Sequence, residues 1–173
     1  MRILAFNTTH DSSVCCINDG YIEFFCKEER LSRIKRDRNP FKSLQLFESI
    51  NKEKIDHILF CTPSNRGGDM EFFYSEYIKK LFNKDMENFS VLTHHLCHAS
   101  SAFYNSGFKE ALSFVIDRNG SIVFQNSSDP CREAESVFKF KYPSSIEILY
   151  KSFWTNHLIP IDKINLKKYV HTI

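Results

Sequence analysis

The start of the chain alternates short apolar runs with turn residues. Three apolar runs of strand length follow one another, at residues 2–7, 13–17 and 21–26. The second and third are separated by Asn-Asp-Gly at residues 18–20, a sequence typical of a tight hairpin turn. We therefore expect three consecutive strands, the last two antiparallel, with residues 8–12 forming the turn between the first two.

The next part of the chain alternates helical and strand patterns. Residues 41–55 carry apolar side chains at helical spacing and lead into a strand run at 58–61. Residues 72–82 repeat the helical pattern, residues 89–92 are again a strand run, and a further helix is expected to begin at Thr93. The resulting order, β-β-β-α-β-α-β-α, predicts an α/β fold with a mixed sheet.

The strand pattern begins again after residue 108. Three strand runs are expected, at residues 110–117, 121–125 and 136–141, and a helix is expected to begin within residues 146–154. The repeat of three strands predicts two lobes. We expect the first lobe at residues 1–108 and an incomplete start of the second at 109–173.

Charge and composition narrow the classes of function. Lysine and arginine number 23 against 21 acidic residues, and a net charge of +2 does not favour a dedicated nucleic-acid surface. No run is long and apolar enough to span a membrane. The six cysteines form no CxxC pair and mostly lie in apolar runs, which is typical of free thiols. Without a signal peptide, we expect a cytoplasmic protein.

Residues 27–38 hold the densest cluster of charges, of both signs. The default interpretation of such a run is a solvated face. A pocket for a phosphorylated ligand could instead use Arg33 and Lys35, with the acids orienting them. RNA association is a third interpretation, and the interspersed acids oppose it.

The first predicted turn brings together His10, Asp11 and Ser12 at the end of a strand. Hydroxyl and backbone N–H groups there could bind a phosphate, or His10 could act as an acid or base. In the alternative interpretation, Asp11 and Ser12 only satisfy backbone donors of the turn.

His94 and His98 stand four residues apart in the helix expected after Thr93, so their imidazoles converge on one face while His95 points away. Such a pair can bind zinc or ferrous iron together with a third ligand, usually a carboxylate. Histidines at this spacing are more often partly exposed or satisfied in a core. Metal binding is favoured by the position, because open α/β sheets bind ligands where a strand ends and a helix begins.

Residues 10–12, 28–35 and 94–103 together resemble the N-terminal part of the carbamoyltransferases. This family includes the nodulation-factor and antibiotic O-carbamoyltransferases and is related to the enzyme that makes threonylcarbamoyladenosine in tRNA. The resemblance implies a ribonuclease H-like lobe similar to the actin, hexokinase and Hsp70 ATPases. It also implies a reaction in which ATP activates the carbamoyl group of carbamoyl phosphate as carbamoyladenylate, before transfer to a small-molecule hydroxyl acceptor.

The resemblance also implies ligand and catalytic residues. His94 and His98 match a metal-binding HxxxH pair, which in the family is completed by a later aspartate from a region that this chain does not contain; iron or zinc is the expected metal. His10 matches a histidine near the transfer site and is a candidate base for the acceptor hydroxyl. Lys35 and Arg33 match basic residues near the carbamoyl or phosphate oxygens.

Three further residues are expected to bind substrate: Asp11, Ser12 and Asp117. Asp117 matches the aspartate that opens the second lobe of the family. The family usually has a glycine next, so that a nucleotide or phosphate can approach the backbone, and here Arg118 stands in its place. The lysine- and glycine-rich motif and the domain that makes carbamoyladenylate have no match in the sequence.

We therefore expect the N-terminal portion of an O-carbamoyltransferase, as a split or truncated gene product or a fragment, that is inactive alone. The alternative, from another functional class, is a non-catalytic scaffold or binding module that a companion chain completes. An unpaired sheet edge and an apolar face on the incomplete lobe would suit such a partner.

Overall fold

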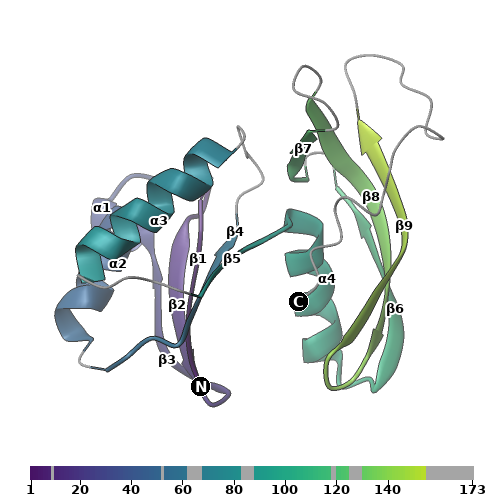
Figure 1. Cartoon of the computed structure of the whole chain (residues 1–173), viewed down its shortest axis with the longest axis horizontal. Helices are drawn as coiled ribbons and strands as arrows, with labels where there is room; N and C mark the ends of the chain where they lie inside the picture. The colour runs from purple at the N-terminus through teal and green to yellow at the C-terminus, as the bar shows by residue number, and fades with distance from the viewer. Residues whose placement is uncertain are drawn as a thin grey trace. The chain divides into compact units, whose positions relative to one another are not determined.

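The computed structural model describes residues 1–8, 10–51, 53–61, 68–82, 88–117, 120–124 and 130–154. The chain divides into two compact units, Met1–Thr93 and His94–Ile173. Each unit has its own sheet and its own core (Figure 1). None of the helices in the described residues is long and apolar enough to cross a lipid bilayer.

The first unit contains one mixed five-stranded sheet in the order β3-β2-β1-β4-β5. Its strands are β1 (Arg2–Asn7), β2 (Ser13–Asn18), β3 (Tyr21–Lys27), β4 (His57–Cys61) and β5 (Phe89–Leu92). The hairpin-linked pairs β1–β2 and β2–β3 are antiparallel, and β1–β4 and β4–β5, which are joined through helices, are parallel. The predicted α/β class and mixed sheet are thus confirmed.

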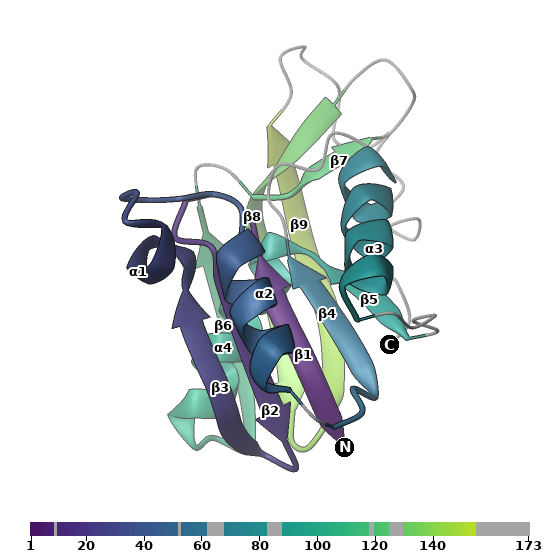
Figure 2. The same ribbon diagram turned by 90° about the vertical axis from the view of Figure 1, so that its left-hand side faces the viewer.

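Three helices accompany this sheet: α1 (Glu28–Ser32), α2 (Phe41–Ile50) and α3 (Gly68–Phe82). Figure 2 shows α2 and α3 on one face of the sheet. The core between them is rich in aromatic rings, among which the centroids of Phe6 and Phe60 lie 5.0 Å apart and those of Phe60 and Tyr74 5.1 Å apart. Each such ring, fully buried, contributes roughly 1.5–3 kcal/mol. The aromatic residues of the first unit therefore serve mainly as its core.

The second unit is an antiparallel sheet with one helix. Its elements are α4 (His94–Ser106), β6 (Glu110–Ile116), β7 (Ile122–Phe124), β8 (Pro130–Lys141) and β9 (Ser145–Trp154). The long strand β8 pairs with the other three. The helix expected within residues 146–154 is wrong, because Ile146 and Ile148 alternate with exposed Glu147 and pack in the core as β9 pairs along β8.

The helix that carries the paired histidines belongs to the second unit, which begins at His94, whereas the strand pattern predicts a first lobe that ends at residue 108. Its inward face supplies Ala99 and Phe103, which pack with Phe138 and Phe140 of β8. The rings of Phe103 and Phe140 stack with their centroids 4.8 Å apart. Burial of this face against β6 and β8 therefore decides where α4 lies, which the order of elements along the chain cannot do.

Candidate metal centre

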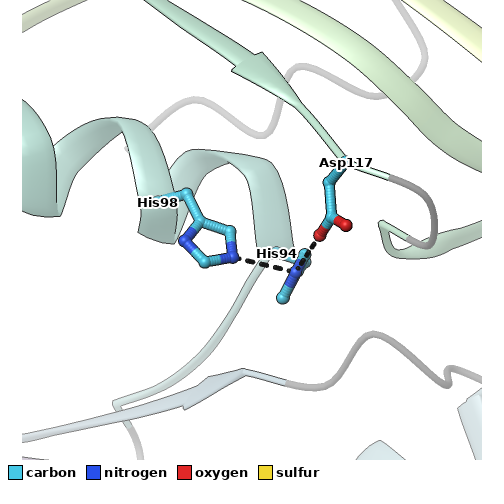
Figure 3. A group of neighbouring side chains, drawn as sticks. All are labelled: His94, His98 and Asp117. Carbon is cyan, nitrogen blue, oxygen red and sulfur yellow. Dashed lines mark hydrogen bonds and ion pairs between the residues drawn. The ribbon is translucent and has the colours of Figure 1, made fainter.

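Three side chains of metal-binding type converge at the start of α4 (Figure 3). His94 Nε2 lies 3.0 Å from His98 Nε2 and 2.8 Å from Asp117 Oδ2. The three ligand atoms all lie within 4.8 Å of one another. This is the one such group of three histidine, cysteine or acidic residues found among the described residues.

Local structure explains why these three side chains meet. His94 and His98 are one helical turn apart, so their rings share a face of α4. Asp117 directly follows β6, two residues after buried Val115, and successive strand residues point to opposite faces. The carboxylate therefore leaves β6 on the face that α4 covers. The Asp117 N–H donates to the Ala134 carbonyl at 3.2 Å, which ties this residue to β8.

The geometry and donor set fit a divalent metal. Ligand atoms about 2.0–2.2 Å from a tetrahedral ion lie roughly 3.3–3.6 Å apart. The 2.8 Å and 3.0 Å spacings of His94 to Asp117 and to His98 need only a small expansion to reach this range. Two imidazoles and a carboxylate suit zinc or ferrous iron. His94 and Asp117 are half-buried and His98 is exposed, which leaves the group open to solvent. Partial burial lowers the pKa of His98, and His94 lowers it further, so the neutral, ligating form dominates at pH 7.

Asp117 also belongs to this group, whereas the resemblance implies a substrate-binding role for it. The resemblance implies that a later aspartate, not Asp117, supplies the third ligand. The structure brings the Asp117 carboxylate to His94 within this chain. The sequence could not reveal this, because the meeting depends on how α4 docks on the sheet, not on the 23 positions that separate the two residues.

His95 points into the second unit, as its position on the helix predicted. Its ring is fully buried, and Nδ1 lies 2.8 Å from the Ser136 hydroxyl. Burial lowers the pKa of His95, although the Glu133 carboxylate partly opposes this. Nε2 has no hydrogen-bond partner among the described residues.

Sequence reasoning missed the buried ion pair of Glu133 and Lys151 behind the helix start. Burial acts to raise the pKa of Glu133, but the Lys151 ammonium outweighs it and holds the pKa below its usual range. The sequence pattern predicts this strand from residue 136, whereas β8 begins at Pro130 and carries Glu133 into the interior. No local pattern signals this, because a charged residue normally indicates an exposed position.

The candidate residues of the first unit cluster around Asp11. One Asp11 oxygen lies 3.0 Å from His10 Nδ1 and the other accepts from Lys27 Nζ at 3.1 Å. The His10 hydrogen bond, with Lys27 second, lowers the pKa of Asp11. Ser12 is buried, and its hydroxyl donates to the Asp37 carbonyl at 2.9 Å. The Ser12 hydroxyl is thus engaged with the backbone of a segment outside the turn.

Arg33 and Lys35 lie just beyond α1 and are exposed. Arg33 ends the helix in the left-handed conformation, with φ at 61°. Neither side chain makes an ion pair with another described residue. Glu28, in the same charged segment, is buried.

Comparison with known proteins matches the part of the chain that holds the metal-centre candidates. The family model described as Carbamoyltransferase N-terminus matches residues 69–170. This range contains His94, His98 and Asp117 but not His10 or Lys35.

Two curated proteins are similar to parts of the chain. Nodulation protein NolNO of Sinorhizobium fredii is 28% identical over 137 residues, which cover 66% of this chain and 20% of that protein. The uncharacterized protein MJ1058 of Methanocaldococcus jannaschii is 51% identical over 45 residues, covering 25% of this chain and 7% of that protein. The chain thus aligns with at most about a fifth of either relative.

The family match extends from α3 through all described elements of the second unit. It covers more than half of the 173 residues. The chain therefore belongs to the carbamoyltransferase N-terminus family.

Proposed function

We propose that this chain is the N-terminal portion of an O-carbamoyltransferase and that His94, His98 and Asp117 hold a divalent metal, iron or zinc, in it. The observation that carries the proposal is the convergence of these three side chains inside the region that matches the family. The complete reaction takes carbamoyl phosphate and ATP through carbamoyladenylate to a carbamoylated small-molecule alcohol. The mixed β-β-β-α-β-α-β sheet of the first unit supports a ribonuclease H-like lobe of the actin and Hsp70 type.

The residues present suit transfer of an acyl-type group. A bound divalent metal would act as a Lewis acid that polarises a carbonyl oxygen. His94 Nε2 and Asp117 Oδ2 already share a hydrogen bond. A bound metal would take the place of the shared proton and would require little movement of the chain. In the first unit, Asp11 engages His10 Nδ1 and leaves Nε2 to take the proton of an attacking hydroxyl. Arg33 and Lys35 would attract carbamoyl or phosphate oxygens.

Formation of carbamoyladenylate is not assigned to any residue of this chain. NolNO, the nodulation protein, extends well beyond the fifth of its length that aligns here. The 173 residues alone are therefore proposed not to complete turnover. Incubation with carbamoyl phosphate, ATP and a panel of alcohols should release no pyrophosphate and form no carbamate ester; either product would overturn the claim of inactivity.

Metal content tests the centre itself. The chain purified without chelator should contain close to one equivalent of iron or zinc by elemental analysis, and a His94→Ala/His98→Ala variant should contain none. His57→Ala is the matched control, since His57 lies on β4 with its ring 3.0 Å from the Ser90 hydroxyl, outside the cluster. Equal metal in all three proteins, or none in the wild type after incubation with either metal, would contradict the proposal.

A second candidate function is a binding module completed by a companion chain. The outer face of β6 carries Leu112, Phe114 and Ile116, which are 53%, 67% and 81% exposed in this structure. We infer that a chain carrying the remaining carbamoyltransferase sequence covers them. Co-expression with the rest of NolNO should yield a complex that Phe114→Lys abolishes and Phe25→Lys, on the exposed face of β3, does not. A chain that stays alone would argue against the module.

A further inference from the structure

Two opposite charges lie inside the second unit, behind the helix that carries the paired histidines. Glu133 is 0% exposed and Lys151 is 5% exposed, and they form a direct ion pair between β8 and β9. A buried ion pair adds little net stability compared with an apolar pair of the same volume. The hydrogen bonds of Glu133 indicate a role other than net stability.

The Glu133 side chain holds the first turn of α4. Its Oε2 accepts the backbone N–H of Ser121 at 3.1 Å and that of His95 at 3.4 Å. The Ser121 hydroxyl in turn accepts the backbone N–H of His94 at 2.8 Å. The first N–H groups of a helix have no acceptor within the helix. Here Ser121 and Glu133 supply the acceptors for two of these groups.

The Glu133 backbone holds the segment that carries Asp117. The Glu133 N–H donates to the Ser121 carbonyl and the Glu133 carbonyl accepts from the Gly120 N–H, both at 3.0 Å. The adjacent Ala134 carbonyl accepts the Asp117 N–H. One stretch of β8 thus fixes both the start of the helix with His94 and the end of β6 with Asp117.

Gly120 marks how closely these parts approach. A Cβ atom at this position would lie 2.5 Å from Glu133 Cβ and 2.7 Å from His95 Nε2. Contacts under 3.0 Å force something to shift. The helix start, Gly120 and β8 therefore meet without room for even one methyl group.

We propose that Glu133, paired with Lys151, is a positioning residue that keeps His94 and Asp117 at the spacing a metal requires. The proposal rests on the metal centre proposed above. Glu133 does not touch the ligand atoms; it acts through the backbone of His95 and through Ser121. Lys151 neutralises the buried carboxylate and fixes its second oxygen.

The test variant is Glu133→Gln/Lys151→Met, which removes both charges and leaves no buried charge unpaired. The matched control is Glu28→Gln. Glu28 is also buried at a helix start, where it accepts the N–H groups of Lys42 and Ser43 and the Ser43 hydroxyl. It has the same structural role at the start of α2, in the first unit.

The readouts are Co²⁺ affinity and the visible absorption spectrum of bound Co²⁺, with thermal unfolding of each protein as a check of the fold. The Glu133→Gln/Lys151→Met variant should bind Co²⁺ about 10–100-fold more weakly, with an altered spectrum, as changes behind metal ligands typically do. Glu28→Gln should lower the unfolding temperature yet keep the wild-type affinity and spectrum. Wild-type affinity and spectrum in the double variant would overturn the proposal.

A milder pair of variants covers the case in which the double variant does not fold. Ser121→Ala removes the acceptor of the His94 N–H and should weaken Co²⁺ binding, whereas Ser121→Thr keeps the hydroxyl and should restore it. Equal affinity in both would contradict the positioning role.

Amide hydrogen exchange tests the positioning role of Glu133 whether or not the protein binds metal. If the wild type binds no Co²⁺, the metal centre fails, and positioning is then measured without metal. The amides of His94 and His95 should lose protection in Glu133→Gln/Lys151→Met and keep it in Glu28→Gln. Unchanged protection in the double variant would overturn the positioning role independently.

Discussion

The two candidate sites of this chain differ in what fixes their side chains. The metal-centre residues of the second unit stand on a helix and a strand whose ends are joined by the buried Glu133. The cluster of His10, Asp11 and Lys27 in the first unit is joined by its own side chains, and the His10 side chain is 74% exposed. Metal ligands need fixed spacing before the ion arrives, whereas an exposed acid-base group can be ordered by its substrate. We therefore infer that the proposed metal centre is preformed, and we call it the preformed site. We infer that the cluster of His10, Asp11 and Lys27 is ordered by its ligand, and we call it the adaptable site.

The largest expected effect comes from breaking the core beneath the preformed site. Phe103→Ala removes a ring stacked on Phe140 and should lower the free energy of unfolding of the second unit by about 3–5 kcal/mol. It should also abolish metal binding, because α4 loses its docking. Phe47→Ala, in the core of the first unit, should cost a similar amount in that unit and leave metal binding intact. Chemical denaturation with Co²⁺ titration checks both, and metal loss in both variants would contradict separate cores.

Replacing the carboxylate ligand should have the next largest effect. Asp117→Asn keeps the shape of the side chain but removes its charge, and the affinity for Zn²⁺ should fall by more than about 100-fold, beyond what changes behind the ligands cause. Isothermal titration calorimetry measures this. The control is Asp56→Asn in the first unit. In the wild type, the Asp56 carboxylate accepts the backbone N–H of Arg2. A loss below about tenfold would return Asp117 to the substrate-binding role expected from the sequence.

Filling the space at Gly120 should have an intermediate effect. Gly120→Ala forces overlap with Glu133 and His95 and should destabilise the second unit by roughly 1–3 kcal/mol, with weaker metal binding. Gly107→Ala is the contrast: its Cβ would meet nothing within 4 Å, and only its φ of +78° makes the change costly. Gly107→Ala should therefore leave metal affinity unchanged, and equal metal losses in the two variants would contradict the close approach at Gly120.

The smallest effect concerns acid titration of the adaptable site. Because His10 and Lys27 lower the pKa of Asp11 below 3.8, the folded state binds this proton less readily than the unfolded state. The resulting stability is fully present above pH 3.8 and is lost as the pH falls through the folded pKa. Carboxyl NMR titration should show the Asp11 pKa rising toward 3.8 in Lys27→Met and further in His10→Ala. An unchanged Asp11 pKa in both variants would show that neither partner acts on it.

The amino-acid sequence alone determined the local features of this protein. The Asn-Asp-Gly turn predicted the β2–β3 hairpin, alternation and helical spacing predicted the mixed sheet of the first unit, and the four-residue spacing predicted that His94 and His98 converge. Each depends on residues that are neighbours along the chain, so period and turn chemistry suffice.

Tertiary structure decided everything that depends on distant residues. Residues 146–154 form a strand because they pair along β8. Helix α4 packs in the second unit because its Phe103 ring stacks on Phe140. The packing of α4 on the sheet also brings Asp117 to His94 and makes Glu133 a buried hydrogen-bond acceptor. Such contacts form because burial of a whole helix face outweighs local preference, and no local window of the sequence contains both partners.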